Sequence, residues 1–177
     1  MSDDSEAIRR VLDGDVASFR VLVERYEARL FGLLRNLLSV NADCEDVAQE
    51  VFLAAYVNLA SYRPESARFS TWLFTIARNK CLNLLQKRRP ITLAKLPEPL
   101  VERTPEDAQS QEEFFRQLDA ALAELPFEQK TAFVFAELQG LTYEEIARLE
   151  GVSVGTVKSR IGRARAKLRC HLKATAS

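Results

Sequence analysis

Hydrophobic residues recur every three or four positions along most of the chain, which is the pattern of amphipathic α-helices. In the first half this pattern predicts three helices. The first follows Asp15, a residue type that caps helices, and its apolar face consists of Phe19, Leu22, Val23, Tyr26, Leu30 and Leu33. The apolar residues of the second helix are Val47, Val51 and Ala54, flanked by Phe52 and Tyr56. Those of the third helix are Trp72, Leu73, Ile76, Ala77, Leu84 and Leu85.

The periodicity stops at Pro90, because proline has no amide hydrogen with which to continue a helix. Three further prolines interrupt the next stretch, which predicts a flexible linker. A helix restarts at Thr104-Pro105-Glu106-Asp107, which combines a capping threonine, a first-turn proline and acids near the positive end of the helix dipole. We therefore predict an all-α fold of two small helical domains, residues 1–90 and 110–177, joined by a flexible linker over residues 91–109.

A helix-turn-helix is predicted near the C-terminus. Thr142-Tyr-Glu-Glu145 has the pattern of a capping box, in which the two outer side chains satisfy the first amides of a helix. Gly151 offers the left-handed conformation that ends a helix, and Ser153 can cap another helix two residues later. A helix, a three-residue turn with glycine and a second helix form the motif that many DNA-binding proteins use. The alternative interpretation is a plain helical hairpin inside a bundle.

The last helix favours DNA binding over the plain hairpin. At 100° per residue, its core-facing residues are Val157, Ile161, Ala164, Leu168 and Leu172. Ser159, Gly162, Arg163 and Ala166 point directly outward, with only cations on the flanks, namely Lys158, Arg160, Arg165, Lys167 and Arg169. Small residues at the centre of the outward face permit close approach, while the flanking cations can reach two phosphate strands. A recognition helix in a major groove needs both properties.

Charge is distributed in blocks along a chain whose formal net charge is zero. Residues 61–90 carry seven basic side chains and one acidic side chain, and residues 156–177 carry seven basic and none acidic. The remaining segments are acidic, which leaves two basic patches on an acidic body. A chain of zero net charge should bind DNA weakly alone, because phosphate binding depends on net positive charge. We therefore expect a protein partner to supply further affinity.

Several other classes of protein do not fit the sequence. The N-terminus is acidic and polar, and no stretch approaches the roughly 18 apolar residues of a membrane span. We therefore expect a cytoplasmic protein without membrane insertion. Cys44, Cys81 and Cys170 are far apart, which does not indicate a disulfide framework. Cys170 and His171 are adjacent, but two ligands do not make a zinc site. We expect no metal and no cofactor.

With these residues in view, the chain resembles the extracytoplasmic-function (ECF) sigma factors of bacteria, from about Asp15 to Lys173. The resemblance rests on four segments that occur in the family's order and spacing: Phe19-Arg-Val-Leu-Val-Glu-Arg-Tyr26, Asp43-Cys-Glu-Asp-Val-Ala-Gln-Glu-Val-Phe52, Phe69-Ser-Thr-Trp-Leu-Phe-Thr-Ile-Ala-Arg-Asn79 and Gly155-Thr-Val-Lys-Ser-Arg-Ile-Gly-Arg-Ala-Arg165. Members of this family are not enzymes. They bind core RNA polymerase, direct it to a promoter and open the DNA.

The resemblance implies roles for both domains. The N-terminal domain would bind the β′ clamp helices of the polymerase and recognise the minus-ten element as a single strand. The C-terminal domain would recognise the minus-thirty-five duplex, and the β flap would be a second contact on the polymerase. An anti-sigma factor is a further partner that the family implies, and the linker would thread across the polymerase.

The resemblance also implies three sets of site residues. The polymerase-binding residues are Asp46, Gln49, Glu50 and Phe52. The minus-ten residues are Tyr62, Asn79, Lys80, Lys87 and Arg88. The minus-thirty-five residues are Thr156, Lys158, Ser159, Arg160 and Arg163. Gly162 also matches a reading position, but it has no side chain with which to contact a base. Trp72 and Phe74 are interpreted as core residues and not as stacking platforms.

Two other hypotheses compete with this interpretation. The first is an autonomous helix-turn-helix regulator whose N-terminal domain dimerises or senses a ligand, and it leaves the basic segment 61–90 unexplained. The second is a hydrolase that uses the acids Asp43, Glu45, Asp46 and Glu50. Such an enzyme needs a metal or a pocket with other reactive groups. The single histidine and the lack of a Gly-rich phosphate loop argue against it.

Overall fold

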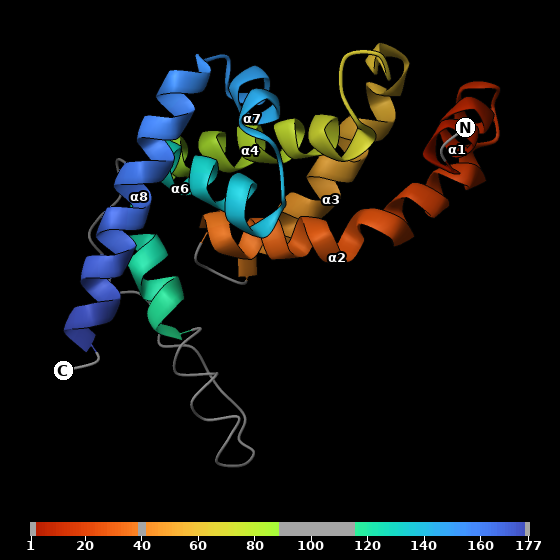
Figure 1. Cartoon of the computed structure of the whole chain (residues 1–177). Helices are drawn as coiled ribbons and strands as arrows, with labels where there is room; N and C mark the ends of the chain where they lie inside the picture. The colour runs from red at the N-terminus through yellow and green to blue at the C-terminus, as the bar shows by residue number, and fades with distance from the viewer. Residues whose placement is uncertain (1–2, 39–41, 89–115, 176–177) are drawn as a thin grey trace.

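The structure is a computed structural model that describes residues 3–38, 42–88 and 116–175. Throughout these ranges every regular element is helical, as predicted. The N-terminal domain consists of α1 (Asp3–Leu12), α2 (Phe19–Leu38), α3 (Ala42–Val57) and α4 (Phe69–Arg88). The C-terminal domain begins with a helix over residues 116–123 and continues with α6 (Phe127–Phe133), α7 (Tyr143–Glu150) and α8 (Val154–Thr175). Figure 1 shows α8 and α1 at opposite ends of the molecule.

The N-terminal domain packs α2, α3 and α4 around one apolar core. The predicted periodic positions form this core, including Leu22, Leu30, Leu33, Val51 and Leu73, each fully buried. Phe74 is also fully buried, as predicted, whereas Trp72 is only half-buried. The whole predicted linker, residues 91–109, lies outside the described residues, and so does the capping segment Thr104–Asp107 within it.

Helix α1 is an element that the sequence pattern did not predict. Its buried residues Ala7, Ile8 and Val11 pack on α2, where the Tyr26 hydroxyl donates a 2.6 Å hydrogen bond to Asp4. Burial and this acidic neighbour raise the pKa of Tyr26. Asp15 does not cap α2 directly, because a short 3-10 helix, Val16–Ser18, lies between them. The Asp15 carboxylate instead accepts a 2.6 Å hydrogen bond from the Ser18 hydroxyl.

The helix-turn-helix forms as predicted. The Thr142 hydroxyl accepts from the Glu145 amide and the Glu145 carboxylate accepts from the Thr142 amide, which completes the capping box. Gly151 ends α7 with φ of +66°, a conformation that residues with a Cβ rarely adopt. After Gly151-Val152-Ser153, the Ser153 hydroxyl accepts a 3.1 Å hydrogen bond from the Thr156 amide at the start of α8. These caps define where α7 begins and ends and where α8 begins.

The two domains pack against each other. The rings of Phe74 in α4 and Phe135 in the C-terminal domain stack at 6.5 Å, and both are fully buried. Arg29 of α2 lies over Phe74 at 5.3 Å and donates a hydrogen bond to the Gln139 carbonyl. Figure 1 shows α7 beside α4, which is a further contact between the two domains. The sequence predicted two domains but did not predict this interface between them.

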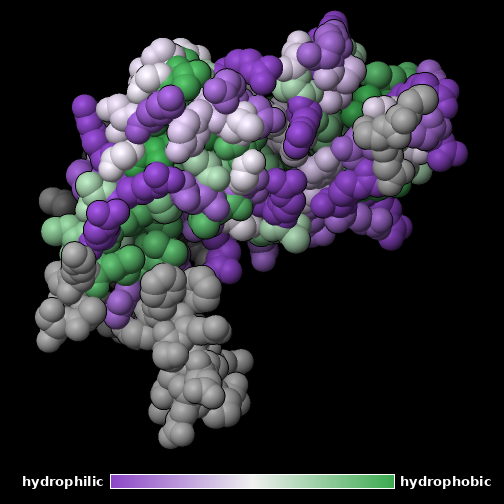
Figure 2. Space-filling model, in the orientation of Figure 1, coloured by the Kyte–Doolittle hydropathy of each residue, from purple (hydrophilic) through white to green (hydrophobic). Residues whose placement is uncertain are grey.

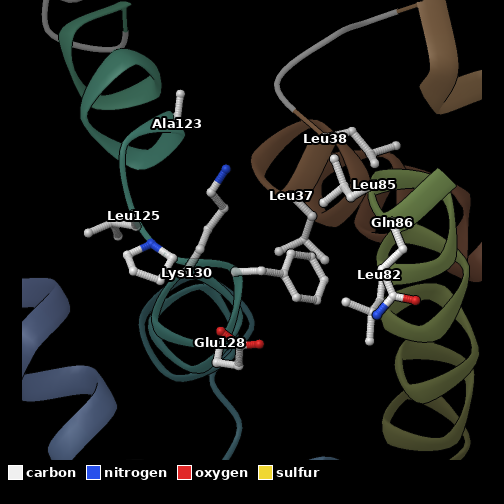
Figure 3. A pocket seen from close by; sticks show the side chains of 11 residues that line it. Leu37, Leu38, Leu82, Leu85, Gln86, Ala123, Leu125, Glu128 and Lys130 are labelled. Carbon is white, nitrogen blue, oxygen red and sulfur yellow. The ribbon is translucent and has the colours of Figure 1, made fainter. Parts of the chain in front are cut away.

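A pocket of about 470 Å³ lies where the ends of α2 and α4 meet α6 (Figure 3). Leucines form much of its wall, and Lys130 of α6 is buried at its edge. Burial lowers the pKa of Lys130. On the face in view in Figure 2, apolar residues also gather between α8 and helix 116–123, while most of the remaining surface is hydrophilic.

Candidate nucleic-acid and protein-binding surfaces

Helix α8 has the two faces that the sequence predicted. Val157, Ile161, Ala164 and Leu168 are buried in the C-terminal domain, and Leu172 is half-buried. The predicted minus-thirty-five residues Lys158, Ser159 and Arg163 are exposed, as is Gly162. Open space surrounds the position that a Cβ on Gly162 would occupy. The outward surface of α8 therefore combines small residues with cations and can approach a DNA groove.

Arg160 differs from the other predicted minus-thirty-five residues because it contacts an acid in its own chain. Its guanidinium lies 2.5 Å from the carboxylate of Glu150, the last residue of α7. Thr156 is also engaged, since its hydroxyl lies 3.0 Å from that of Ser153. Thr156 is half-buried and supports the start of α8. The helical wheel indicated the direction of each residue from the axis but not these partners.

The predicted minus-ten residues lie on α4 and on the loop before it. Tyr62 is half-buried, and its ring packs on Phe69 and Trp72 at 5.6 and 5.4 Å. Its hydroxyl donates a 3.0 Å hydrogen bond to the Ala67 carbonyl, which shapes the loop. Burial raises the pKa of Tyr62. Tyr62 and Trp72 are both only partly buried in this aromatic cluster.

The polar residues of this set lie along α4. Asn79 is exposed and accepts a 3.2 Å hydrogen bond from Arg78. Lys80 donates a 2.8 Å hydrogen bond to Glu50 of α3. Lys87 is exposed, and the side chain of Arg88 lies outside the described residues. Lys80 and Lys87 are seven residues apart and therefore lie on one side of α4.

The exposed side of α3 that carries the predicted polymerase-binding residues also includes apolar residues that the sequence analysis did not name. Asp46, Gln49 and Glu50 are exposed on one side of the helix, whereas Phe52 is half-buried against the core. The same side continues with Leu53 and Val57, which are 63% and 69% exposed. We call these five residues, Asp46, Gln49, Glu50, Leu53 and Val57, the α3 face. Leu53 and Val57 follow Asp46, Gln49 and Glu50 at helical spacings of three and four residues, and this periodicity could have revealed the apolar part of the face.

We next consider how the possible metal-binding side chains are placed among the described residues. They contain no group of three or more His, Cys, Asp or Glu side chains placed to hold a metal ion. His171 pairs with Glu124 at 3.3 Å. Glu45, Asp46 and Glu50 are exposed on a helix surface, and the side chain of Asp43 lies outside the described residues. Cys44 and Cys81 are both buried, whereas Cys170 is exposed.

Comparison with known proteins identifies the family. Residues 22–91 match the family model of Sigma-70 region 2, and residues 115–168 match that of Sigma-70 region 4. The ECF RNA polymerase sigma-E factor of Haemophilus influenzae is 41% identical over 174 residues, covering 92% of this chain and 91% of its own. The sigma-E factor of Escherichia coli K12 is 37% identical, with 92% and 90% covered. The chain belongs to the ECF sigma factors, proteins that direct RNA polymerase to promoters.

Solved structures support the same conclusion. The structure of CnrH in complex with the cytosolic domain of CnrY has a TM-score of 0.74 and 28% identity, covering 98% of this chain and 99% of CnrH. The sigma factor RpoE of Bartonella quintana, solved with the anti-sigma factor NepR, has a TM-score of 0.71 and 25% identity, covering 88% and 96%. The predicted family and the predicted fold class are therefore confirmed. No helix among the described residues is long and apolar enough to cross a membrane.

Proposed function

We propose that this sigma factor binds core RNA polymerase through the α3 face. The β′ clamp helices are the expected partner, and a basic and apolar helical surface would complement the acidic and apolar halves of this face. The hydrogen bond from Lys80 lowers the pKa of Glu50, which favours the negatively charged form of this carboxylate. In this proposal the acids of α3 serve protein binding and not hydrolysis, and the protein has no catalytic role of its own. It acts with the polymerase in the cytoplasm.

We propose that α8 binds the minus-thirty-five duplex and that the β flap supports this domain. The exposed surface of Lys158, Ser159, Gly162 and Arg163 on a rigidly capped helix is the observation that carries this assignment. Ser159 and the helix backbone can approach base edges, while Lys158 and Arg163 can contact phosphates on either side. Glycine at position 162 makes close approach possible without itself specifying a base.

We propose that Tyr62, Asn79, Lys80 and Lys87 bind the minus-ten strand, with Arg88 as the matching residue at the end of α4. Aromatic stacking on Tyr62 would hold an unpaired base, while the lysines would bind the backbone. We also propose an anti-sigma factor as a partner. The fold of this chain is similar to that of the sigma factor RpoE, which was solved in complex with the anti-sigma factor NepR, and this similarity supports the proposal.

The first experiment measures binding of the full chain to core RNA polymerase by fluorescence anisotropy, followed by transcription from a candidate promoter. Nanomolar binding that an Asp46→Ala, Gln49→Ala variant loses would support the role and the position of the interface. Equal binding by the variant would move the interface away from the α3 face. A folded protein that binds no polymerase but binds duplex DNA tightly would overturn the proposal in favour of an autonomous regulator.

A further inference from the structure

The carboxylate of Glu150 lies buried between the two domains. Its side chain is 0% exposed, and it contacts Arg160 of α8 at 2.5 Å and the Thr131 hydroxyl of α6 at 2.7 Å. The third neighbour, Arg78, belongs to α4 of the other domain and lies 4.0 Å away. The side chains of Arg160 and Arg78 are 22% and 14% exposed. One buried anion is therefore shared by two arginines from different domains.

This arrangement makes the position of Arg160 depend on the domain interface. A buried carboxylate is costly unless cations and hydrogen bonds compensate it. While the domains are packed together, a move of Arg160 to a DNA phosphate would remove one of the cations that compensate the buried Glu150 carboxylate. Only Arg78 and Thr131 would then remain beside it. If α4 moved away, water would reach Glu150, and the loss of Arg160 would cost much less.

The helix-turn-helix is also joined to the loop before α4 in the packed state. Arg148 of α7 donates a 2.9 Å hydrogen bond to the Ser66 carbonyl, which lies in the loop between Tyr62 and α4. Promoter elements about 25 base pairs apart span roughly 85 Å at 3.4 Å per step. Surfaces joined by direct hydrogen bonds cannot reach both elements, so the domains must separate before the chain binds both.

We propose that Glu150 is a positioning residue that couples separation of the domains to DNA binding by α8. In the packed state Glu150 holds Arg160 away from phosphate and binds the N-terminal domain through Arg78. Separation releases Arg160 for DNA, and by reciprocity DNA binding favours separation. This inference rests on the proposed function, in that it takes α8 to be the duplex-binding helix.

The C-terminal domain provides a matched control in Glu137. Its carboxylate lies 2.6 Å from Arg165 of α8, and this contact raises the pKa of Arg165. Glu137 is exposed, and the partner that it contacts belongs to its own domain. Glu150→Gln and Glu137→Gln each remove one negative charge beside an arginine of α8, but only the first alters the contact between the domains.

The test combines DNA affinity with an interdomain distance in the full chain. A donor and an acceptor dye are placed on Cys170 of α8 and on a cysteine introduced by Glu27→Cys in α2, both exposed positions. Affinity is measured at low salt with a labelled duplex of about 30 base pairs, since phosphate contacts dominate there. Energy transfer is measured with and without the duplex, and circular dichroism checks that each variant is folded.

In the wild-type protein we expect the duplex to reduce energy transfer. Both Glu→Gln variants should bind the duplex about twofold to fivefold more tightly, since each frees an arginine. Only Glu150→Gln should show reduced energy transfer before DNA is added, with little further change on binding. Arg78→Met should also reduce energy transfer while leaving the Glu150–Arg160 pair intact, and it serves as the second variant if Glu150→Gln does not fold.

Two results would overturn the coupling. One is energy transfer in folded Glu150→Gln and Arg78→Met that equals the wild-type value. The other is a decrease in energy transfer in Glu137→Gln equal to that in Glu150→Gln, which would show that loss of any negative charge beside α8 has this effect. Failure of the proposed function would give a different result, because the wild-type chain would then not bind the polymerase. The energy transfer measured without DNA would still show whether Glu150 holds the two domains together.

Discussion

Lys80 lies 2.8 Å from Glu50, so a residue of the proposed minus-ten surface is paired with a residue of the α3 face. Glu50→Gln should weaken polymerase binding by roughly threefold to tenfold, because an amide loses the attraction to a basic partner. Anisotropy with labelled core polymerase measures the change. Glu27→Gln is the control, since Glu27 is exposed on α2 and not on α3. Equal losses in the two variants would contradict a specific role for Glu50.

Leu53 tests the apolar half of the α3 face. Leu53→Ser should reduce polymerase affinity by about fivefold to thirtyfold, which corresponds to about 1–2 kcal/mol of lost apolar burial. The free energy of unfolding should change by less than about 0.5 kcal/mol, because the residue is already exposed. Val21→Ser, at an exposed apolar position of α2, should leave binding unchanged. Full affinity in Leu53→Ser would restrict the interface to the acidic half.

Two glycines of the helix-turn-helix, Gly151 and Gly162, should respond to alanine in opposite directions. Gly151→Ala should lower the free energy of unfolding by about 1 kcal/mol or more, because φ of +66° is unfavourable with a Cβ. Gly162→Ala should raise it by about 0.5–1 kcal/mol, because alanine favours helix and meets no neighbour there. Urea denaturation measures both. Destabilisation by Gly162→Ala would show that α8 needs this glycine for a reason other than space.

The thiol of Cys81 should make stability depend on alkaline pH. Burial raises its pKa from 9.0 to about 12. The unfolded chain therefore loses this proton near pH 9 while the folded chain keeps it, and the free energy of unfolding should fall as the pH rises from about 9 toward 12. The slope from one proton is at most about 1.4 kcal/mol per pH unit.

Cys81→Ala should remove that part of the slope, measured by urea denaturation between about pH 8 and pH 10.5, where an unfolded thiol titrates. Burial lowers the pKa of Lys130, which makes stability rise with pH in both proteins. The difference between the two slopes therefore reports the thiol together with its electrostatic effect on Lys130. Identical slopes would mean that the Cys81 thiol titrates in the folded protein as it does in the unfolded chain.

Local sequence signals predicted much of this fold. The capping box at Thr142, the turn at Gly151 and the buried side of α8 depend on neighbours within a few residues, and each was confirmed. Helix α1 was missed because its buried apolar residues Ala7, Ile8 and Val11 are few, so the helix depends on packing against α2.

Contacts between distant residues could not be predicted in this way. The pairing of Arg160 with Glu150 depends on the angle between α7 and α8, and the stacking of Phe74 on Phe135 joins residues from different domains. Periodicity shows that such residues are buried or exposed but not which partner they meet. The residues proposed to bind polymerase and promoter therefore remain predictions, while the framework that holds them is established.

The stacking of Phe74 on Phe135 has a consequence for the lifetime of the protein in the cell. A chain with separated domains exposes two large aromatic side chains that water otherwise never reaches. Such a chain would be vulnerable to aggregation and to proteases unless another molecule covered it promptly. The same interface that withholds Arg160 from DNA would therefore also protect unused copies of the protein, so that a variant held open would be both more active and shorter-lived.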